Sequence, residues 1–274
     1  MKLFRLLQFL SIDIGLAAVA SATFASQALN LEPPAVYYLV LFLIVLGIYN
    51  ADHAWDAGRI EDRSDSRRAF HFRWRRTIAV LSGICIFSGA LLALLLPKEV
   101  VIGGLLVGLL MCVYFLMLRA GRLTRLKELF VTIGFTSGIW VPLLLSGNPD
   151  FRIGVLIVLF FIACALNLLS LALCDLHIDR LHGETNLALV TSESFVRLVI
   201  GILCIVGALA GLAIVLTRPD WFITVSLIQV LIQVGLSFWT SNRHEAIRLI
   251  GDWAFLLYAI PWVIQKLDSL HLIS

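Results

Sequence analysis

The stretch Ile153–Asp179, IGVLIVLFFIACALNLLSLALCDLHID, shows the plan on which the chain is built. Its first part, residues 153–174, carries no charge and is long enough to cross a ~30 Å hydrocarbon core as a helix. The run then stops at two aspartates, Asp175 and Asp179. A carboxylate costs several kcal/mol in hydrocarbon, so an acid here is normally present for a partner, an ion or water. The stretch predicts a membrane helix that brings two acids to one membrane surface.

A second pair of acids with the same spacing ends an earlier apolar run. Asp52 and Asp56, in DHAWD, follow the charge-free run Pro33–Ala51. At i and i+4 two side chains share one face of a helix, with their β-carbons roughly 5–6 Å apart. The oxygens of each pair can therefore converge on one hard cation, and oxygen ligands suit Mg²⁺ better than Zn²⁺. Two matching DxxxD strings suggest a cation site.

The composition is that of a membrane protein. The chain has 274 residues, of which 60% are hydrophobic and 14% charged, and its mean hydropathy of +0.97 excludes an ordinary soluble domain. We expect an all-α, polytopic protein with nine transmembrane helices. A retained first helix is favoured over a cleaved signal peptide, because eight further spans follow. The expected spans are Ile14–Leu31, Pro33–Ala51, Thr77–Pro97, Val100–Leu118, Leu129–Pro149, Ile153–Cys174, Leu198–Thr217, Trp221–Asn242 and about Leu249–Gln265.

The connections between spans alternate between tight turns and longer polar loops. The side of the longer loops, which also holds the N-terminus, contains 17 of the 21 basic residues. The positive-inside rule then places the N-terminus and both DxxxD loops in the cytoplasm, at the plasma membrane if the chain is bacterial. The five cysteines form no CxxC pair and are expected to pack in the spans. No aromatic-interleaved basic region indicates nucleic-acid binding, and the lipid bilayer is the expected surrounding.

The two DxxxD strings occur four spans apart, which suggests an internal duplication. We expect a single domain over residues 1–274, with four-helix units at about 10–120 and 126–240 and a ninth helix at about 249–266. Parallel repeats in membrane proteins commonly place the ligand site between their halves. This arrangement would bring both acidic faces together across a central cavity open to the cytoplasm.

Both strings resemble motifs of the UbiA superfamily of intramembrane prenyltransferases, which includes 4-hydroxybenzoate polyprenyltransferases. The family's first motif, NDxxDxxxD, is similar to Tyr49–Asp56, YNADHAWD, although Ala51 stands where an acid beside the asparagine is usual. The second motif, DxxxD followed by Arg, Gly and Thr, is similar to Asp175–Thr185, DLHIDRLHGET. Leu171, one helical turn before Asp175, stands where a further acid could precede this second motif. The resemblance covers essentially the whole chain, which is identified as a divergent member.

The resemblance implies a UbiA-like helix bundle and a reaction. Members transfer a prenyl group from a prenyl diphosphate to a small, often aromatic or lipophilic acceptor, with Mg²⁺ as cofactor. It implies catalytic and metal-binding roles for Asp52, Asp56, Asp175 and Asp179. It also implies diphosphate-binding roles for Asn50, Arg59, Arg68, Lys127 and Arg180.

Other functions stay open at this point. The acids could simply end two helices and pair with arginines, and Arg248 and Asp252 are spaced for a helical ion pair. The chain could be an ion-coupled transporter, although transporter sites usually lie near mid-membrane rather than at span ends. It could also be a catalytically inactive family member that acts as a membrane scaffold, because acids are missing at Ala51 and Leu171.

Overall fold

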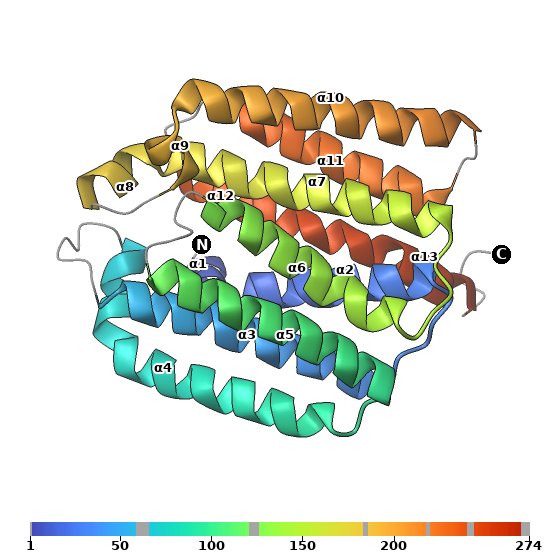
Figure 1. The fold of residues 1–274 in the computed structure, drawn as a ribbon, viewed down its shortest axis with the longest axis horizontal. Helices are drawn as coiled ribbons and strands as arrows, with labels where there is room; N and C mark the ends of the chain where they lie inside the picture. Colours follow the sequence, from blue (N-terminus) through green and yellow to red (C-terminus); the bar gives the residue numbers. More distant parts are fainter. Residues whose placement is uncertain are drawn as a thin grey trace.

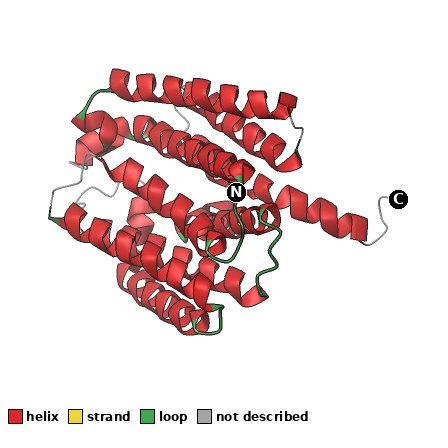
Figure 2. Ribbon diagram, turned by 45° about the vertical axis from the view of Figure 1, so that its right-hand side comes forward, coloured by secondary structure: helices red, strands yellow, loops and turns green. Residues whose placement is uncertain are grey.

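The structure, a computed structural model, describes residues 2–58, 66–120, 126–182, 186–217, 220–239 and 244–269. Helices make up 89% of these described residues, and no strand occurs among them (Figure 2). The helices are α1 Lys2–Phe9, α2 Ile12–Ala28, α3 Ala35–Asp56, α4 Ser66–Ala93, α5 Lys98–Arg119, α6 Lys127–Leu144, α7 Phe151–Cys174, α8 Leu176–His182, α9 Leu187–Val190, α10 Glu193–Thr217, α11 Trp221–Phe238, α12 His244–Ala254, the 3₁₀ helix η2 Phe255–Ala259 and α13 Ile260–Ser269.

The long helices lie side by side along one common direction (Figure 1). The C-terminal ends of α3 and α7 lie at the same end of the bundle, together with the starts of α4, α6 and α12 and the short helices α8 and α9 (Figure 1). We call this the DxxxD end. The α2–α3, α4–α5, α6–α7 and α10–α11 connections lie at the opposite end. The alternation of loops in the sequence thus corresponds to two distinct ends of the bundle.

Helix α7 forms the centre of the bundle. In the most apolar 18-residue segment of α7, 67% of the residues are buried, whereas in the corresponding segments of α3, α4 and α5 only 17% are buried. Asp150 caps the start of α7, because its side chain accepts a hydrogen bond of 3.0 Å from the Ile153 N–H. The fully buried side chains of Leu156, Leu159 and Phe160 follow in the next turns. A helix that is apolar on all sides is stable here because other helices cover it.

Seven helices in the described part of the chain are long and apolar enough to cross a membrane. They support an integral membrane protein. The seven are Ala35–Asp56, Ala69–Ala93, Lys98–Leu118, Phe151–Cys174, Glu193–Leu216, Trp221–Phe238 and Ala246–Ser269. Helix α2 is a shorter apolar helix, and α6 is not among the seven. The nine crossings, the central cavity and the duplicated units therefore stay predictions.

Helices α5 and α6 approach closely at Gly103, which is buried against Pro142. A β-carbon at Gly103 would lie 2.7 Å from Pro142 Cα and 3.0 Å from Pro142 N. These are backbone atoms, which cannot rotate away as a side chain could. The neighbouring Gly104 has nothing within 4 Å of an added β-carbon. Only the first glycine is required by packing.

We expect Gly103→Ala to destabilise the protein by about 1–3 kcal/mol, because an inserted methyl group would force the α5 and α6 backbones apart. Gly104→Ala, the matched control, should be neutral or stabilising by up to about 1 kcal/mol, since alanine favours a helix more than glycine does. Apparent melting temperatures in detergent micelles measure both. Equal melting temperatures for the two variants would contradict the close α5–α6 contact.

Candidate functional site

The first DxxxD string lies at the end of one continuous helix. Asp52 and Asp56 are in the last turns of α3, one turn apart as the spacing predicts. Asn50 is buried, and its Nδ2 donates to Leu10 O at 2.7 Å and to Leu46 O at 2.9 Å. The amide thus fastens α3 to the chain between α1 and α2. The buried Asn50 Oδ1 has no hydrogen-bond partner, so it is the part of this side chain that can still accept a ligand.

The second string spans the junction of two helices. Asp175 is the C-cap of α7 and Asp179 lies on α8, but the Asp179 N–H donates to Asp175 O at 2.8 Å, so the helical spacing is kept. Asp179 is buried, and its Oδ2 accepts a hydrogen bond of 2.7 Å from Asn186 Nδ2. The Asn186 amide also donates to Ala172 O at 3.1 Å. These bonds fix the carboxylate of Asp179 against the end of α7.

Arg248 on α12 binds the second string. Its Nη2 donates to Asp175 Oδ2, and the two side chains are only 19% and 23% exposed. The expected partner of Arg248 was Asp252, one turn along the same helix. Asp252 also accepts a hydrogen bond of 3.0 Å from Asn167 on α7. Arg248 therefore ties α12 to the end of α7, in addition to its electrostatic interaction with Asp252.

Basic residues from three helices act on the first string. The ring of His53, inside the first string, interacts electrostatically with Arg67 of α4, Lys127 of α6 and Arg248 of α12. Arg248 is the residue that binds Asp175, so it connects the surroundings of both strings. Both strings lie at the same end of the bundle, and Arg248 interacts with one residue of each, His53 and Asp175.

Tyr114 of α5 marks another side of this region. It interacts electrostatically with both Asp52 and Asp56 and with Glu128 of α6. Glu128 is buried, and its Oε1 accepts a hydrogen bond of 2.9 Å from the Leu187 N–H at the start of α9. Glu128 is therefore used to hold α9 in place. Lys127, the first residue of α6, interacts electrostatically with the ring of His53 in the first string.

For the other residues that the sequence predicts in the site, the structure describes only some of the positions. Arg180 follows Asp179 on α8 and is exposed. Arg68 lies in α4, but its side chain is outside what the structure describes. Arg59, together with Gly183 and Thr185 of the second motif, falls outside the described residues altogether.

Sequence reasoning missed Arg248 and Asn186 as members of the site. Arg248 meets Asp175 across 73 residues of chain, and no local pattern signals such a contact. Asn186 directly follows Thr185, the last residue of the second motif. This proximity in the sequence is the signal by which Asn186 could have been predicted as a site residue. Both residues hold a carboxylate by a directed hydrogen bond.

The donor set fits a magnesium ion that is shared with a phosphate ligand. Within the described ranges, no three His, Cys, Asp or Glu side chains form a group that could hold a metal on their own. Mg²⁺ usually takes one or two carboxylates and completes its shell with substrate phosphates and water, rather than using an all-protein cage. Each DxxxD string offers two carboxylates, and the unpaired Oδ1 of Asn50 adds a neutral oxygen.

The comparisons with known proteins give one match, and it is structural. No protein-family model and no curated protein matches the chain by sequence. A solved structure described as a UbiA homolog from Archaeoglobus fulgidus bound to DMAPP and Mg²⁺ superposes with a TM-score of 0.64. The alignment covers 93% of this chain and 97% of that one, at 11% identity. The chain has a UbiA-like fold. This confirms the fold expected from the two DxxxD strings.

The ion pair between Arg248 and Asp175 should contribute measurably to stability. In a double-mutant cycle with Arg248→Met and Asp175→Asn, we expect a coupling of about 1–3 kcal/mol, because removing one partner leaves a largely buried charge unpaired. The exposed pair of Arg197 and Glu193, one turn apart on α10, is the matched control. It should couple by about 0.5 kcal/mol or less. Additive effects of the two substitutions at Arg248 and Asp175 would argue against the pair.

Proposed function

We propose that the protein transfers a prenyl group from a prenyl diphosphate to a small aromatic or lipophilic acceptor inside the membrane, with Mg²⁺ as cofactor. One observation carries this proposal. Two acid pairs lie at one end of a UbiA-like bundle, and Arg248 pairs with Asp175 of the second string and interacts electrostatically with His53 inside the first. A solved structure of the same fold is bound to DMAPP, a prenyl diphosphate, and Mg²⁺. An anion with its metal needs both acids and cations, and this end supplies both.

In this proposal, the two strings hold opposite sides of the diphosphate group. Asp52 and Asp56 hold one side, with Asn50 Oδ1 as a further acceptor, and Asp175 and Asp179 hold the other. When bound, Mg²⁺ neutralises negative charge on the phosphate oxygens and makes diphosphate a better leaving group. Lys127 and Arg180 contribute positive charge directly. Arg59 and Arg68 have the same proposed role from the sequence.

Arg248 has a second proposed role. Its guanidinium pairs with Asp175 in the structure. An arriving diphosphate gives its guanidinium an anionic partner of matching geometry, and the same event frees Asp175 to act as a ligand. This exchange explains why a residue of the acidic motif is paired with a cation in the structure. It is also compatible with a site that forms fully only around its substrate.

The reaction requires a site that admits little water. The bond between the prenyl carbon and the diphosphate oxygen breaks, and diphosphate leaves with the electron pair. The acceptor then forms a bond to the allylic carbon and loses a proton. Water would capture the allylic cation first, so an apolar surrounding protects it. The interior next to the strings is apolar and aromatic, with Tyr114 stacked on Phe130 at 5.0 Å between ring centroids.

The acids of both strings can be tested by direct binding and by product analysis. We expect Asp52→Asn, Asp56→Asn, Asp175→Asn and Asp179→Asn each to lower Mg²⁺-dependent transfer by at least about a hundredfold, the scale typical of lost transition-state charge stabilisation. Glu32→Gln, an exposed acid at the opposite end, should leave it unchanged. The assay incubates purified protein and Mg²⁺ with several prenyl diphosphates and aromatic acceptors, and detects products by mass.

The outcomes separate the competing functions. Activity that persists in all four aspartate variants would contradict the proposed site. No product and no diphosphate release from the wild-type protein with any substrate pair would favour the inactive scaffold. Cation flux into liposomes that depends on the same aspartates would favour the transporter.

Lys127 should act on binding more than on later steps. We expect Lys127→Met to raise the KM for prenyl diphosphate by about ten- to a hundredfold, because one charge-assisted contact contributes about 1.5–3 kcal/mol. Lys98→Met at the opposite end, where Lys98 is exposed beside Glu99, is the matched control and should leave the KM unchanged. Equal KM values for the two variants would remove Lys127 from the diphosphate site.

A further inference from the structure

A groove of about 660 Å³ lies between α3 and α4 on the outside of the bundle, near the DxxxD end. Its walls are small and mostly apolar, with two arginines at one end. The residues that matter for its chemistry are Ala51 and Ala54 of α3 and Arg75, Arg76, Ala79 and Gly83 of α4. None of the residues assigned to the proposed prenyl transfer lines this groove.

The groove is separate from the proposed diphosphate site. The α3 residues that line it, Ala51, Ala54 and Trp55, are spaced three and four apart and therefore share one face of the helix. At 3.6 residues per turn, Asp52 and Asp56 lie about 120° around the helix from that face. A ligand in the groove would thus lie on the other side of α3 from the acids. Arg75 and Arg76 are not aimed at the same phosphate as the DxxxD strings.

The two arginines mark the level of the membrane surface. They are the last charges before the run Thr77–Pro97, which has none. Trp55 and Trp74 at the same level are each 47% exposed, as is typical of aromatic side chains at a membrane interface. From Arg76 the groove continues along α4 to Ile86, a distance of about 15 Å at 1.5 Å per residue. The groove therefore has a charged end at headgroup level and an apolar floor that runs into hydrocarbon.

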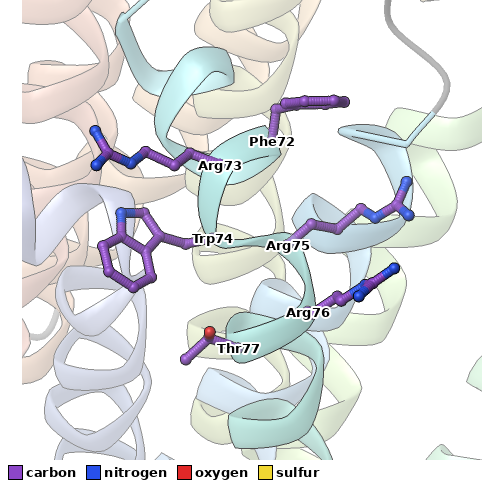
Figure 3. Close-up of a pocket in the computed structure, with 6 residues that line it drawn as sticks. All are labelled: Phe72, Arg73, Trp74, Arg75, Arg76 and Thr77. Atoms are coloured by element: carbon purple, nitrogen blue, oxygen red, sulfur yellow. The ribbon is translucent and has the colours of Figure 1, made fainter.

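The side chains around this turn of α4 divide into two directions. Arg73 and Trp74 extend to one side and Arg75 and Arg76 to the other, around a smaller hollow of about 390 Å³ (Figure 3). The Arg73 guanidinium lies 5.9 Å from the centroid of the Trp74 ring. Arg75 reaches across to the chain just after α3, since a β-carbon at Gly58 would lie 2.7 Å from Arg75 Nη1. Both groove arginines are exposed, so a bound anion can reach them.

We propose that this groove binds one anionic phospholipid. The headgroup phosphate contacts Arg75 and Arg76, and an acyl chain lies along Ala54, Ala79 and Gly83. Guanidinium groups suit bidentate contact with phosphate, and basic residues beside a membrane span attract anionic lipids. Small side chains leave the floor open, since nothing lies within 4 Å of a β-carbon built on Gly83. The site does not depend on the transfer reaction.

Native mass spectrometry of the detergent-purified full chain tests this proposal. Dioleoyl phosphatidylglycerol should bind the wild-type protein more tightly than dioleoyl phosphatidylcholine. Replacing Arg75 and Arg76 by glutamine should weaken phosphatidylglycerol binding by about fivefold for each arginine. Gly83→Leu should weaken both lipids, because its side chain would fill the floor. Arg73→Gln and Gly104→Leu are the matched controls for charge and for size, and both should bind as the wild type does.

Three outcomes would overturn the proposal. The first is equal affinity of the wild-type protein for the two lipids. The second is unchanged phosphatidylglycerol binding in the double variant Arg75→Gln/Arg76→Gln. Because both side chains are exposed, this variant should fold. The third is displacement of the lipid by geranylgeranyl diphosphate at equal concentration, which would assign the groove to the substrate. Circular dichroism of each variant confirms that helix content is retained.

Discussion

The exclusion of charge from hydrocarbon determines how this chain is arranged. The apolar part of a spanning helix carries few charges, so the acids and bases gather near the helix ends. Because the chain runs back and forth through the bundle, the ends of α3 and α7 and the starts of α4, α6 and α12 meet at one place. Charges that are far apart in the sequence thereby become neighbours. The candidate site is a consequence of this confinement.

Confinement also requires that the gathered charges compensate one another. Asp175 is paired with Arg248, Asp179 is held by Asn186, and Glu128 accepts from the backbone of α9. A ligand that carries several negative charges and a divalent cation could exchange with such contacts at little net cost, because it brings both signs. The proposed chemistry thus follows from the same balance of charge that stabilises the DxxxD end. In the proposed lipid groove, the positive charges of Arg75 and Arg76 are likewise compensated, there by the phosphate of an anionic lipid.

Periodic features were predictable from the sequence, whereas contacts between distant helices were not. The charge-free runs predicted the helices, and the DxxxD strings led to the UbiA-like fold, because span length and i, i+4 spacing are local properties. The contact of Arg248 with Asp175 was missed, because helix spacing indicates only Asp252, whereas Asp175 reaches Arg248 through the packing of α12 on α7. The groove was also missed, because it depends on which faces of α3 and α4 meet. Nine crossings and the cytoplasmic orientation stay predictions.

An experimental structure with Mg²⁺ and a non-hydrolysable prenyl thiodiphosphate tests the central claim most directly, namely that both strings hold one diphosphate. The account predicts diphosphate density at the DxxxD end, with Asp52 and Asp56 on one side, Asp175 and Asp179 on the other, and the Arg248 guanidinium moved from Asp175 to a phosphate oxygen. Diphosphate bound elsewhere, or bound by one string while Arg248 stays on Asp175, would contradict it.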